Sequence, residues 1–339
     1  MMIEGFLRDY WYVAAWHDEL STKPLQRWLL GEPLVLFRTE SGQAVALADR
    51  CPHRGAPLSN GTVIGEAIEC GYHGMTFGAD GACVRLPGQT SAPPKFGTRA
   101  FPIVERWKWV FVWLGDPGKA NESQIPNYHW LDDPAWVGRG ETAHVKCHNS
   151  LLRDNLLDLS HAHFVHQKTL ATDAVIEAPI DVDSDAGKVV VTRRMTDIEP
   201  SPFFARLGGF SGLVNHTQIV TFTPAANIVI AVTVTASDDP ADVADIRVLN
   251  ALTPATANST HYFWSLLRSA RVDDDKLTQF MFTANRDTFV EDFEIVEAQQ
   301  IMLEGAPPPP RSLYFHVDGG ANAAQALVHN LLQAEANAS

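Results

Sequence analysis

The chain has few cysteines, few basic residues and no long apolar run, and each shortage excludes a class of protein. Its 339 residues include only four cysteines, too few for a disulfide scaffold, and 26 Lys and Arg stand against 40 Asp and Glu. The net charge of −14 argues against nucleic acid or an anionic membrane as the main partner, because both need a basic protein face. No apolar stretch approaches the roughly 18 residues of a membrane span. The first residues carry acids and no basic segment before an apolar run, so we expect no signal peptide and a cytoplasmic protein.

The pattern of apolar runs changes within the first half of the chain, and this change predicts two domains. The early part has short apolar runs such as PLVLFR (33–38) and WVFVWLG (109–115), cut by glycine and proline, which indicates an all-β domain. We place this domain at 1–118. Residues 119–339 are predicted to form an α+β domain with an antiparallel sheet and long helices. Its strands are expected at 188–195, 227–237 and 245–252, and its helices at roughly 150–166, 275–303 and 320–336.

CPHRG (51–55) and CGYHG (70–74) are near-copies of one loop. Each supplies one cysteine and one histidine, and sixteen residues separate Cys51 and His53 from Cys70 and His73. A Cys2His2 zinc finger groups its cysteines in one pair and its histidines in the other. Mixed pairs suit a cluster in which one iron takes both thiolates and the other takes both imidazoles. We therefore predict a Rieske 2Fe-2S cluster; the alternatives are a zinc site or loops that bind no metal.

RDNLLDLSHAHFVHQ (153–167) places three histidines in a leucine-rich segment with helical periodicity. On a regular helix, His161 and His166 lie about 140° apart, too far round to share a metal easily. If both are ligands, the helix must end or bulge between them, as helices often do at functional sites. His163 points about 200° away from His161 and is the expected bystander.

Two histidines and one carboxylate hold Fe(II) and leave positions open for O2, so the histidine segment suggests an acidic partner. The predicted helix at 285–300 offers five acids. Asp292 shares the apolar face with Phe289, Ile295 and Val296. The other acids, Asp287, Glu291, Glu294 and Glu297, fall about 100° or more away. Asp292 is therefore the predicted third ligand; the alternative is a pair of core histidines beside an ordinary amphipathic helix.

These motifs resemble those of the Rieske non-heme iron oxygenases, in particular the vanillate O-demethylase oxygenases and their dicamba-demethylating relatives. The resemblance runs from YWYVAAWHDEL near the start to VEDFEIVEAQQ and covers essentially the whole chain. It implies a helix-grip (START-like) second domain, in which an antiparallel sheet wraps around a long helix. It also implies the cluster and iron ligands named above, a polar residue near the iron at Asn155, and a carboxylate at Asp158. In this family that carboxylate links a cluster histidine to an iron histidine across a subunit boundary of a homotrimer.

The function implied by the resemblance is that of a terminal oxygenase, fed by a separate flavin and ferredoxin-type reductase that oxidises NAD(P)H. We predict O-demethylation of a methoxylated aromatic acid with O2, releasing formaldehyde. The alternative is a dioxygenase or a ring or methyl hydroxylase acting on another aromatic compound. A Rieske electron carrier would leave the second domain unexplained, and a lipid-binding module would leave the iron ligands unexplained. Asn227 and Asn250 are candidate substrate ligands, with solvated strand positions as the equal alternative.

Overall fold

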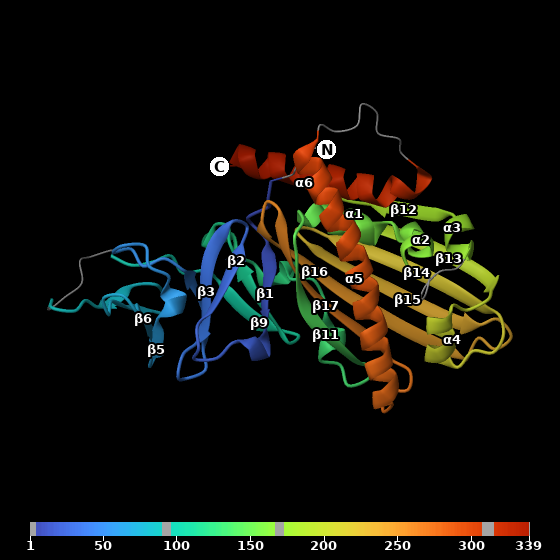
Figure 1. Cartoon of the computed structure of the whole chain (residues 1–339), viewed down its shortest axis with the longest axis horizontal. Coiled ribbons are helices and arrows are strands. Elements are labelled where there is room, and N and C mark those ends of the chain that lie inside the picture. Colours follow the sequence, from blue (N-terminus) through green and yellow to red (C-terminus); the bar gives the residue numbers. More distant parts are fainter. Residues whose placement is uncertain (1–4, 90–95, 167–172, 307–314, 339) are drawn as a thin grey trace. The chain divides into compact units, whose positions relative to one another are not determined.

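The computed structural model describes residues 5–89, 96–166, 173–306 and 315–338, drawn in colour in Figure 1. These residues form two compact units. Arg8–Ile125 together with Thr253–Thr256 make up the N-terminal unit, and the remainder makes up the C-terminal unit. The boundary predicted after residue 118 stays a prediction, and the compact units part at Ile125.

The N-terminal unit consists of three small antiparallel sheets, and no α-helix occurs among its described residues. Alternating and continuous apolar runs form the strands because their side chains fill a shared core that includes Phe37, Leu47 and Phe77. Both cysteines of the predicted cluster border this core. The sheets run in the orders β1 (Trp11–Trp16), β10 (Trp109–Trp113), β9 (Ile103–Arg106); β2 (Leu25–Leu29), β3 (Glu32–Arg38), β4 (Ala44–Ala48); and β5 (Thr62–Ile64), β6 (Ala67–Glu69), β7 (Thr76–Gly78), β8 (Cys83–Arg85).

A seven-stranded antiparallel sheet dominates the C-terminal unit. Buried and less buried residues alternate along strands such as Val189–Ile198, because one face of the sheet is covered and the other is not. Residue Val191 pairs with Val220, and Ile228 with Asn250, in the registers that fix which side chains share the covered face. The strand order is β11 (Val137–Val145), β17 (Ser259–Arg268), β16 (Val243–Thr256), β15 (Asn227–Ala236), β14 (Val214–Thr223), β13 (Val189–Ile198), β12 (Ile180–Ser184).

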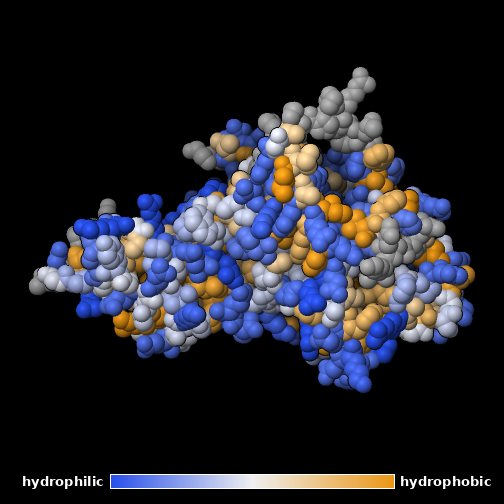
Figure 2. Space-filling view, viewed as in Figure 1, coloured by the Kyte–Doolittle hydropathy of each residue, from blue (hydrophilic) through white to orange (hydrophobic). Residues whose placement is uncertain are grey.

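The long helix α5 (Asp275–Gly305) crosses this sheet, as Figure 1 shows. Its buried side chains, among them Met281, Phe289, Asp292 and Val296, recur at the spacing of one helix face. Ile295, predicted to face the core, is instead 48% exposed, and orange apolar atoms are visible along α5 in Figure 2. The other helices are α1 (Asn149–Leu157), α2 (Ala162–Val165), α3 (Asp173–Glu177), α4 (Pro202–Gly208) and α6 (Gly319–Ala338).

The predicted α+β helix-grip class is confirmed by this arrangement of a large antiparallel sheet and a long helix. Helix α1 packs beside α5, and α6 packs against α1, the edge strand β12 and its neighbour β13. None of the helices in the described part of the chain is long and apolar enough to cross a bilayer.

Candidate iron centres

Two loops of the same construction carry the cysteine–histidine pairs of the N-terminal unit. In each loop, the cysteine N–H donates to the carbonyl five residues later, over 2.8 Å from Cys51 and 2.7 Å from Cys70. The glycine four residues after the cysteine donates back to the cysteine carbonyl. Gly55 and Gly74 hold φ values of 71° and 72°, a backbone conformation that favours glycine. The paired glycines therefore close both loops in the same way.

The two sulfur donors and the two nitrogen donors of these loops lie in different surroundings. Cys51 and Cys70 are buried, whereas His53 and His73 are exposed with their ring centroids 4.7 Å apart. Burial and the neighbouring Cys70 thiol raise the pKa of the Cys51 thiol, so a bound cation would favour its thiolate form. Two thiols lie together beside the core and two imidazoles lie together at the surface.

This sorting distinguishes a two-iron cluster from a zinc site. A single zinc ion draws its donors into one tetrahedron, with edges of roughly 3.5 Å given its bond lengths. Among the described residues, the group of three His, Cys, Asp or Glu donors that lie within 4.8 Å of one another belongs to the C-terminal unit and not to these loops. Separate thiol and imidazole pairs fit a Rieske cluster, where they bind different irons.

The histidine segment of the C-terminal unit is not one regular helix. Helix α1 ends at Asp158, whose extended backbone (φ −113°, ψ 94°) starts a 3-10 turn over Leu159–His161. The short helix α2 follows and stops at His166, which has φ −103° and ψ 46°. The carboxylate of Asp158 accepts a hydrogen bond from the Ser160 N–H over 2.8 Å and so caps the turn. The irregularity that the sequence analysis required is present, and it brings both histidines to one side.

The structure gathers the three predicted ligands of the mononuclear iron. The Nε2 atoms of His161 and His166 each lie 3.3 Å from Oδ1 of Asp292, and one donor atom from each residue falls within 4.8 Å of the others. His166 and Asp292 are 2% and 3% exposed. Burial alone would raise the pKa of Asp292, but the hydrogen bonds and charges of the two histidines lower it to about 2. Two imidazoles and one ionised carboxylate on one side fit the facial iron site. His163 lies outside this group.

Three further groups orient these ligands. Nδ1 of His161 donates to the backbone carbonyl of Asp158, and Nδ1 of His166 donates to Oε2 of Glu291 over 2.8 Å. Both Nε2 atoms are thereby directed toward the shared site. The Asn155 amide donates to Oδ1 of Asp292 over 3.1 Å, so Asn155 lies beside the histidine–aspartate group.

Two of these contacts differ from the prediction. The Asp158 carboxylate was predicted to accept from His161, whereas the carbonyl does so and the carboxylate caps the next turn. Glu291 was predicted to lie on a side face of α5 without a role. Glutamate is long enough to reach from that side face to His166, and its position directly before the ligand Asp292 is the only signal the sequence offers.

We expect Glu291→Ala to weaken iron binding at the mononuclear site and to leave the Rieske cluster in place. Loss of the carboxylate frees the His166 ring, so affinity for Fe(II) should fall by about tenfold to a hundredfold. Anaerobic Fe(II) titration of metal-depleted protein measures this affinity. Glu294→Ala is the matched control, because Glu294 is exposed on the same helix and should bind iron normally. Equal affinities in both variants would contradict the role of Glu291.

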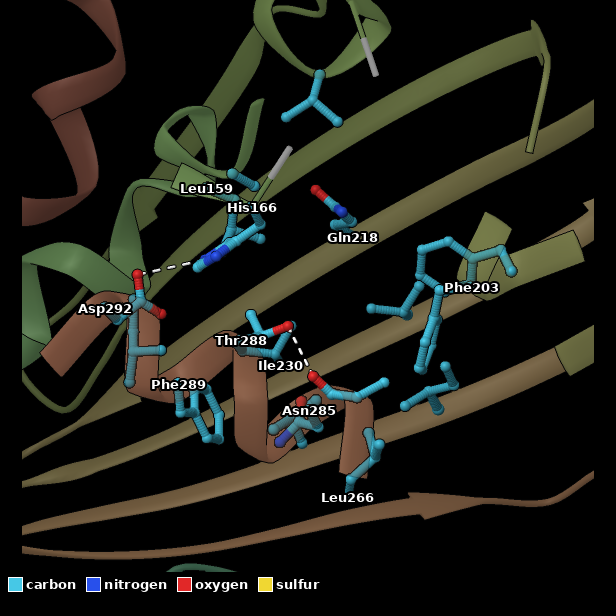
Figure 3. A pocket seen from close by; sticks show the side chains of 18 of the residues that line it. Leu159, His166, Phe203, Gln218, Ile230, Leu266, Asn285, Thr288, Phe289 and Asp292 are labelled. Atoms are coloured by element: carbon cyan, nitrogen blue, oxygen red, sulfur yellow. Dashed lines mark hydrogen bonds and ion pairs between the residues drawn. The ribbon is translucent and has the colours of Figure 1, made fainter. Parts of the chain in front are cut away.

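A mostly apolar cavity of about 110 Å³ adjoins the iron ligands, and Figure 3 shows it from nearby. Its wall comes from α4, β14, β15, β16 and α5, with Phe203, Ile230, Val248 and Phe289 among the apolar side chains. This volume is somewhat smaller than the ~150 Å³ of a cavity known to admit benzene, so it is of the order of one ring and leaves no room for a second. His161, His166 and Asp292 form part of the same wall.

Asn227 and Asn250, the predicted substrate ligands, are not among the residues that line this cavity. Both are buried, so they are not solvated strand residues either. Asn227 accepts a hydrogen bond from the Tyr128 hydroxyl over 2.8 Å, and Asn250 accepts one from Tyr262 over 2.7 Å. Their side chains are used within the protein core.

A cluster-binding β unit joined to a sheet-and-helix unit with a 2-His-1-carboxylate group defines a Rieske-type non-heme iron oxygenase. Two family models match the chain: the Rieske 2Fe-2S domain over residues 10–103, and the vanillate O-demethylase oxygenase C-terminal domain over residues 145–334. The chain belongs to the vanillate O-demethylase oxygenase family. The predicted family, enzyme class and cofactors, a Rieske cluster and a mononuclear iron, are confirmed.

Relatives of this chain match over nearly their whole length. The iron-sulfur subunit of the toluene-4-sulfonate monooxygenase system of Comamonas testosteroni is 35% identical, over 97% of this chain and 98% of the relative. A vanillate O-demethylase oxygenase subunit of Pseudomonas sp. is 32% identical, over 98% and 97%. The crystal structure of dicamba monooxygenase with non-heme iron and dicamba superimposes with a TM-score of 0.86 at 30% identity, over 99% and 100% of the two chains.

The protein as isolated with its metals is expected to be brown and to contain about three irons and two acid-labile sulfides per chain. Two irons belong to the cluster of the N-terminal unit and one to the histidine–aspartate group. Metal and sulfide analysis of the purified protein measures these numbers. Stoichiometric zinc without acid-labile sulfide would contradict the cluster assignment.

Proposed function

We propose that the chain is a terminal oxygenase that hydroxylates a methyl carbon on a single-ring aromatic substrate, most directly the methyl of a methoxylated aromatic acid. The observation that carries the proposal is the cavity itself, because an apolar space of one-ring size has the iron ligands in its wall. The vanillate- and dicamba-demethylating relatives support a methoxy substrate.

The residues of the chain prepare this reaction by holding the substrate and the iron ligands in place and by excluding water. Phe203, Phe289 and Ile230 enclose the ring and keep water away from the reacting carbon. Glu291 and Asn155 hold the ligand side chains, so that the donor set keeps one geometry through turnover. When bound, the cluster supplies electrons and the mononuclear iron activates O2.

The overall reaction balances with two electrons from a partner. One oxygen atom enters a methyl C–H bond, and two electrons and two protons reduce the other oxygen atom to water. The hydroxymethyl ether formed is a hemiacetal. The bond between its CH2 carbon and the aryl oxygen breaks, and the hydroxyl proton passes to the aryl oxygen, which gives a phenol and formaldehyde. The electrons come from a separate flavin and ferredoxin-type NAD(P)H reductase, since the related chains are named as subunits or components of larger systems. A cytoplasmic homotrimer is part of the same proposal.

Hydroxylation of a methyl group attached directly to the ring is the second candidate. It is favoured by the toluene-4-sulfonate monooxygenase subunit, which is as similar to this chain as the demethylases are. In that case the product is a benzylic alcohol and no formaldehyde is released.

A single assay separates the candidates. The oxygenase, combined with a flavin and ferredoxin-type reductase and NADH or NADPH, is supplied with 4-methoxybenzoate or 4-toluenesulfonate. One formaldehyde per O2 consumed supports O-demethylation, and a benzylic alcohol supports methyl hydroxylation. A cis-diol product, or O2 uptake that neither substrate stimulates, would contradict the proposal.

A further inference from the structure

Three polar groups on the cavity wall have no hydrogen-bond partner among the described residues. They are Nε2 of His216, Oε1 of Gln218 and Nδ2 of Asn285, all shielded from solvent. His216 itself is only 4% exposed. Buried polar groups in folded proteins are nearly always paired, and leaving one unpaired is unfavourable. Three such groups on the wall of one cavity indicate that a ligand supplies the missing partners.

Two of these groups, those of His216 and Asn285, lie at the end of the cavity away from the iron ligands. Asn285 precedes Asp292 by seven residues on α5, which corresponds to about 10 Å along the helix. The His216 ring packs edge-on against Phe204 of α4, with centroids 4.6 Å apart. In Figure 3, Gln218 lies between His166 and the α4 residue Phe203. The wall therefore carries polar groups away from the iron ligands as well as beside them.

A buried positive charge, that of Arg193, lies close to the residues of the cavity wall. Arg193 is 4% exposed and is the cross-strand partner of Gln218 in the β13–β14 register. The charge of Asp158 acts on Arg193, and among the described residues that line the cavity the only acid is Asp292, an iron ligand. Burial and the charge of Arg193 lower the pKa of His216 to about 4, so its imidazole is neutral at pH 7. A neutral His216 with its proton on Nε2 and the Asn285 amide both offer N–H donors.

We propose that His216 and Asn285, in the field of Arg193, bind an oxyanionic substituent of the aromatic substrate, a carboxylate or a sulfonate. Gln218 contacts the ring or the same substituent from the β14 side. This inference rests on the proposed function, because the iron at the opposite end fixes which part of the substrate reacts. Arg193 was not found from the sequence, since nothing in its strand distinguishes an arginine facing inward from one facing solvent.

The test measures binding without turnover. Anaerobic calorimetry on the iron-loaded protein, with no reductase present, compares 4-methoxybenzoate, 4-toluenesulfonate and the neutral 4-methoxybenzamide. The wild-type protein should bind at least one anion about tenfold or more tightly than the amide. His216→Phe and Asn285→Leu should each weaken anion binding by roughly tenfold to a hundredfold, as for a lost hydrogen bond to a charged group. Binding of the amide should change far less.

Thr217→Val is the matched control. Thr217 lies between His216 and Gln218 on β14, points to the other face of the sheet and does not line the cavity. Its variant should keep the affinities of the wild type for all three probes. The melting temperatures of His216→Phe and Asn285→Leu should equal or exceed that of the wild type, because an unpaired buried polar group is replaced by an apolar one.

Two results would overturn the inference. One is equal affinity of the wild-type protein for the anions and the amide. The other is a variant that weakens all three probes together and lowers the melting temperature, which indicates a structural role. A preference for one anion identifies carboxylate or sulfonate as the natural substituent. These measurements need no turnover, so an anion preference without any oxygenated product separates a correct site from a wrong reaction.

Discussion

Asp292→Ala is expected to lose the mononuclear iron and all measurable oxygenation while keeping the Rieske cluster. Asp292 provides the only carboxylate of the donor group, and its Oδ1 lies 3.3 Å from both histidine Nε2 atoms. Without it the two imidazoles lose their ionised partner, and turnover should fall by at least about a thousandfold, as when one member of a group that acts as a unit is removed. Iron should drop from about three to about two per chain.

The cluster serves as the internal control of this experiment. Its ligands lie in the other compact unit, so its visible absorption and its electron paramagnetic resonance signal after reduction should match those of the wild type. Glu294→Ala, on the exposed side of the same helix, should retain all three irons and full activity. Bleaching of the Asp292→Ala protein would show that the two metal sites are not independent.

The periodicity of α5 explains why Asp292 was predictable. The buried residues of this helix recur at intervals of four and seven, and Asp292 is the one acid among them. A buried carboxylate needs a partner, so its place on the apolar face was already a functional signal. The same reasoning failed for Glu291, because periodicity fixes the direction in which a side chain leaves the helix and not where a flexible side chain ends.

The shape of the histidine segment could be predicted from the sequence only in a conditional form. The sequence required a break if both His161 and His166 bind one metal, but it could not locate that break. The structure ends α1 at Asp158, where the carboxylate caps the following turn and the carbonyl accepts from His161. The cap and the hydrogen bond to His161 both need an extended backbone at Asp158, which the local sequence does not dictate.

The cavity wall was the part least accessible from sequence. His216, Gln218 and Asn285 come from two elements that are far apart in the chain, and only the sheet register and the helix crossing bring them to one cavity. Strand β14 itself was not predicted. Asn227 and Asn250 looked equally polar in the sequence, but two buried tyrosines use their side chains. Polarity alone could not separate these cases, because the difference lies in which partner each group finds.

Asp158→Asn is expected to keep both metal sites and to slow turnover by about a hundredfold or more. The asparagine carbonyl can still accept from the Ser160 N–H, and the backbone carbonyl still accepts from His161, so the turn and the ligand should be preserved. Only the negative charge is lost. We predict that this charge receives a hydrogen bond from a cluster histidine, His53 or His73, both of which are exposed on their own unit.

We predict that the electron path runs between chains. Some 85 residues separate the cluster motifs from Asp158 in the sequence, and we predict that the cluster facing each iron belongs to a neighbouring subunit of a homotrimer. Slowed turnover should be accompanied by slowed oxidation of the reduced cluster, which stopped-flow absorption measures in single-turnover experiments with substrate and O2. Asp154→Asn, four residues earlier and outside the metal group, is the control and should oxidise its cluster at the rate of the wild type.

Mixed oligomers test the direction of this path. A chain with Cys51→Ser lacks the cluster, and a chain with His161→Ala lacks the mononuclear iron, so each homo-oligomer should be inactive. Co-expressed with two different affinity tags and purified through both, the mixed oligomers should recover a substantial fraction of wild-type activity, because a cluster on one chain can serve an iron on another. The same mixture carrying Asp158→Asn in every chain should lose most of that recovery. If oligomers shown to contain both chains remain as inactive as either parent, electrons pass within one chain and the proposed link through Asp158 fails.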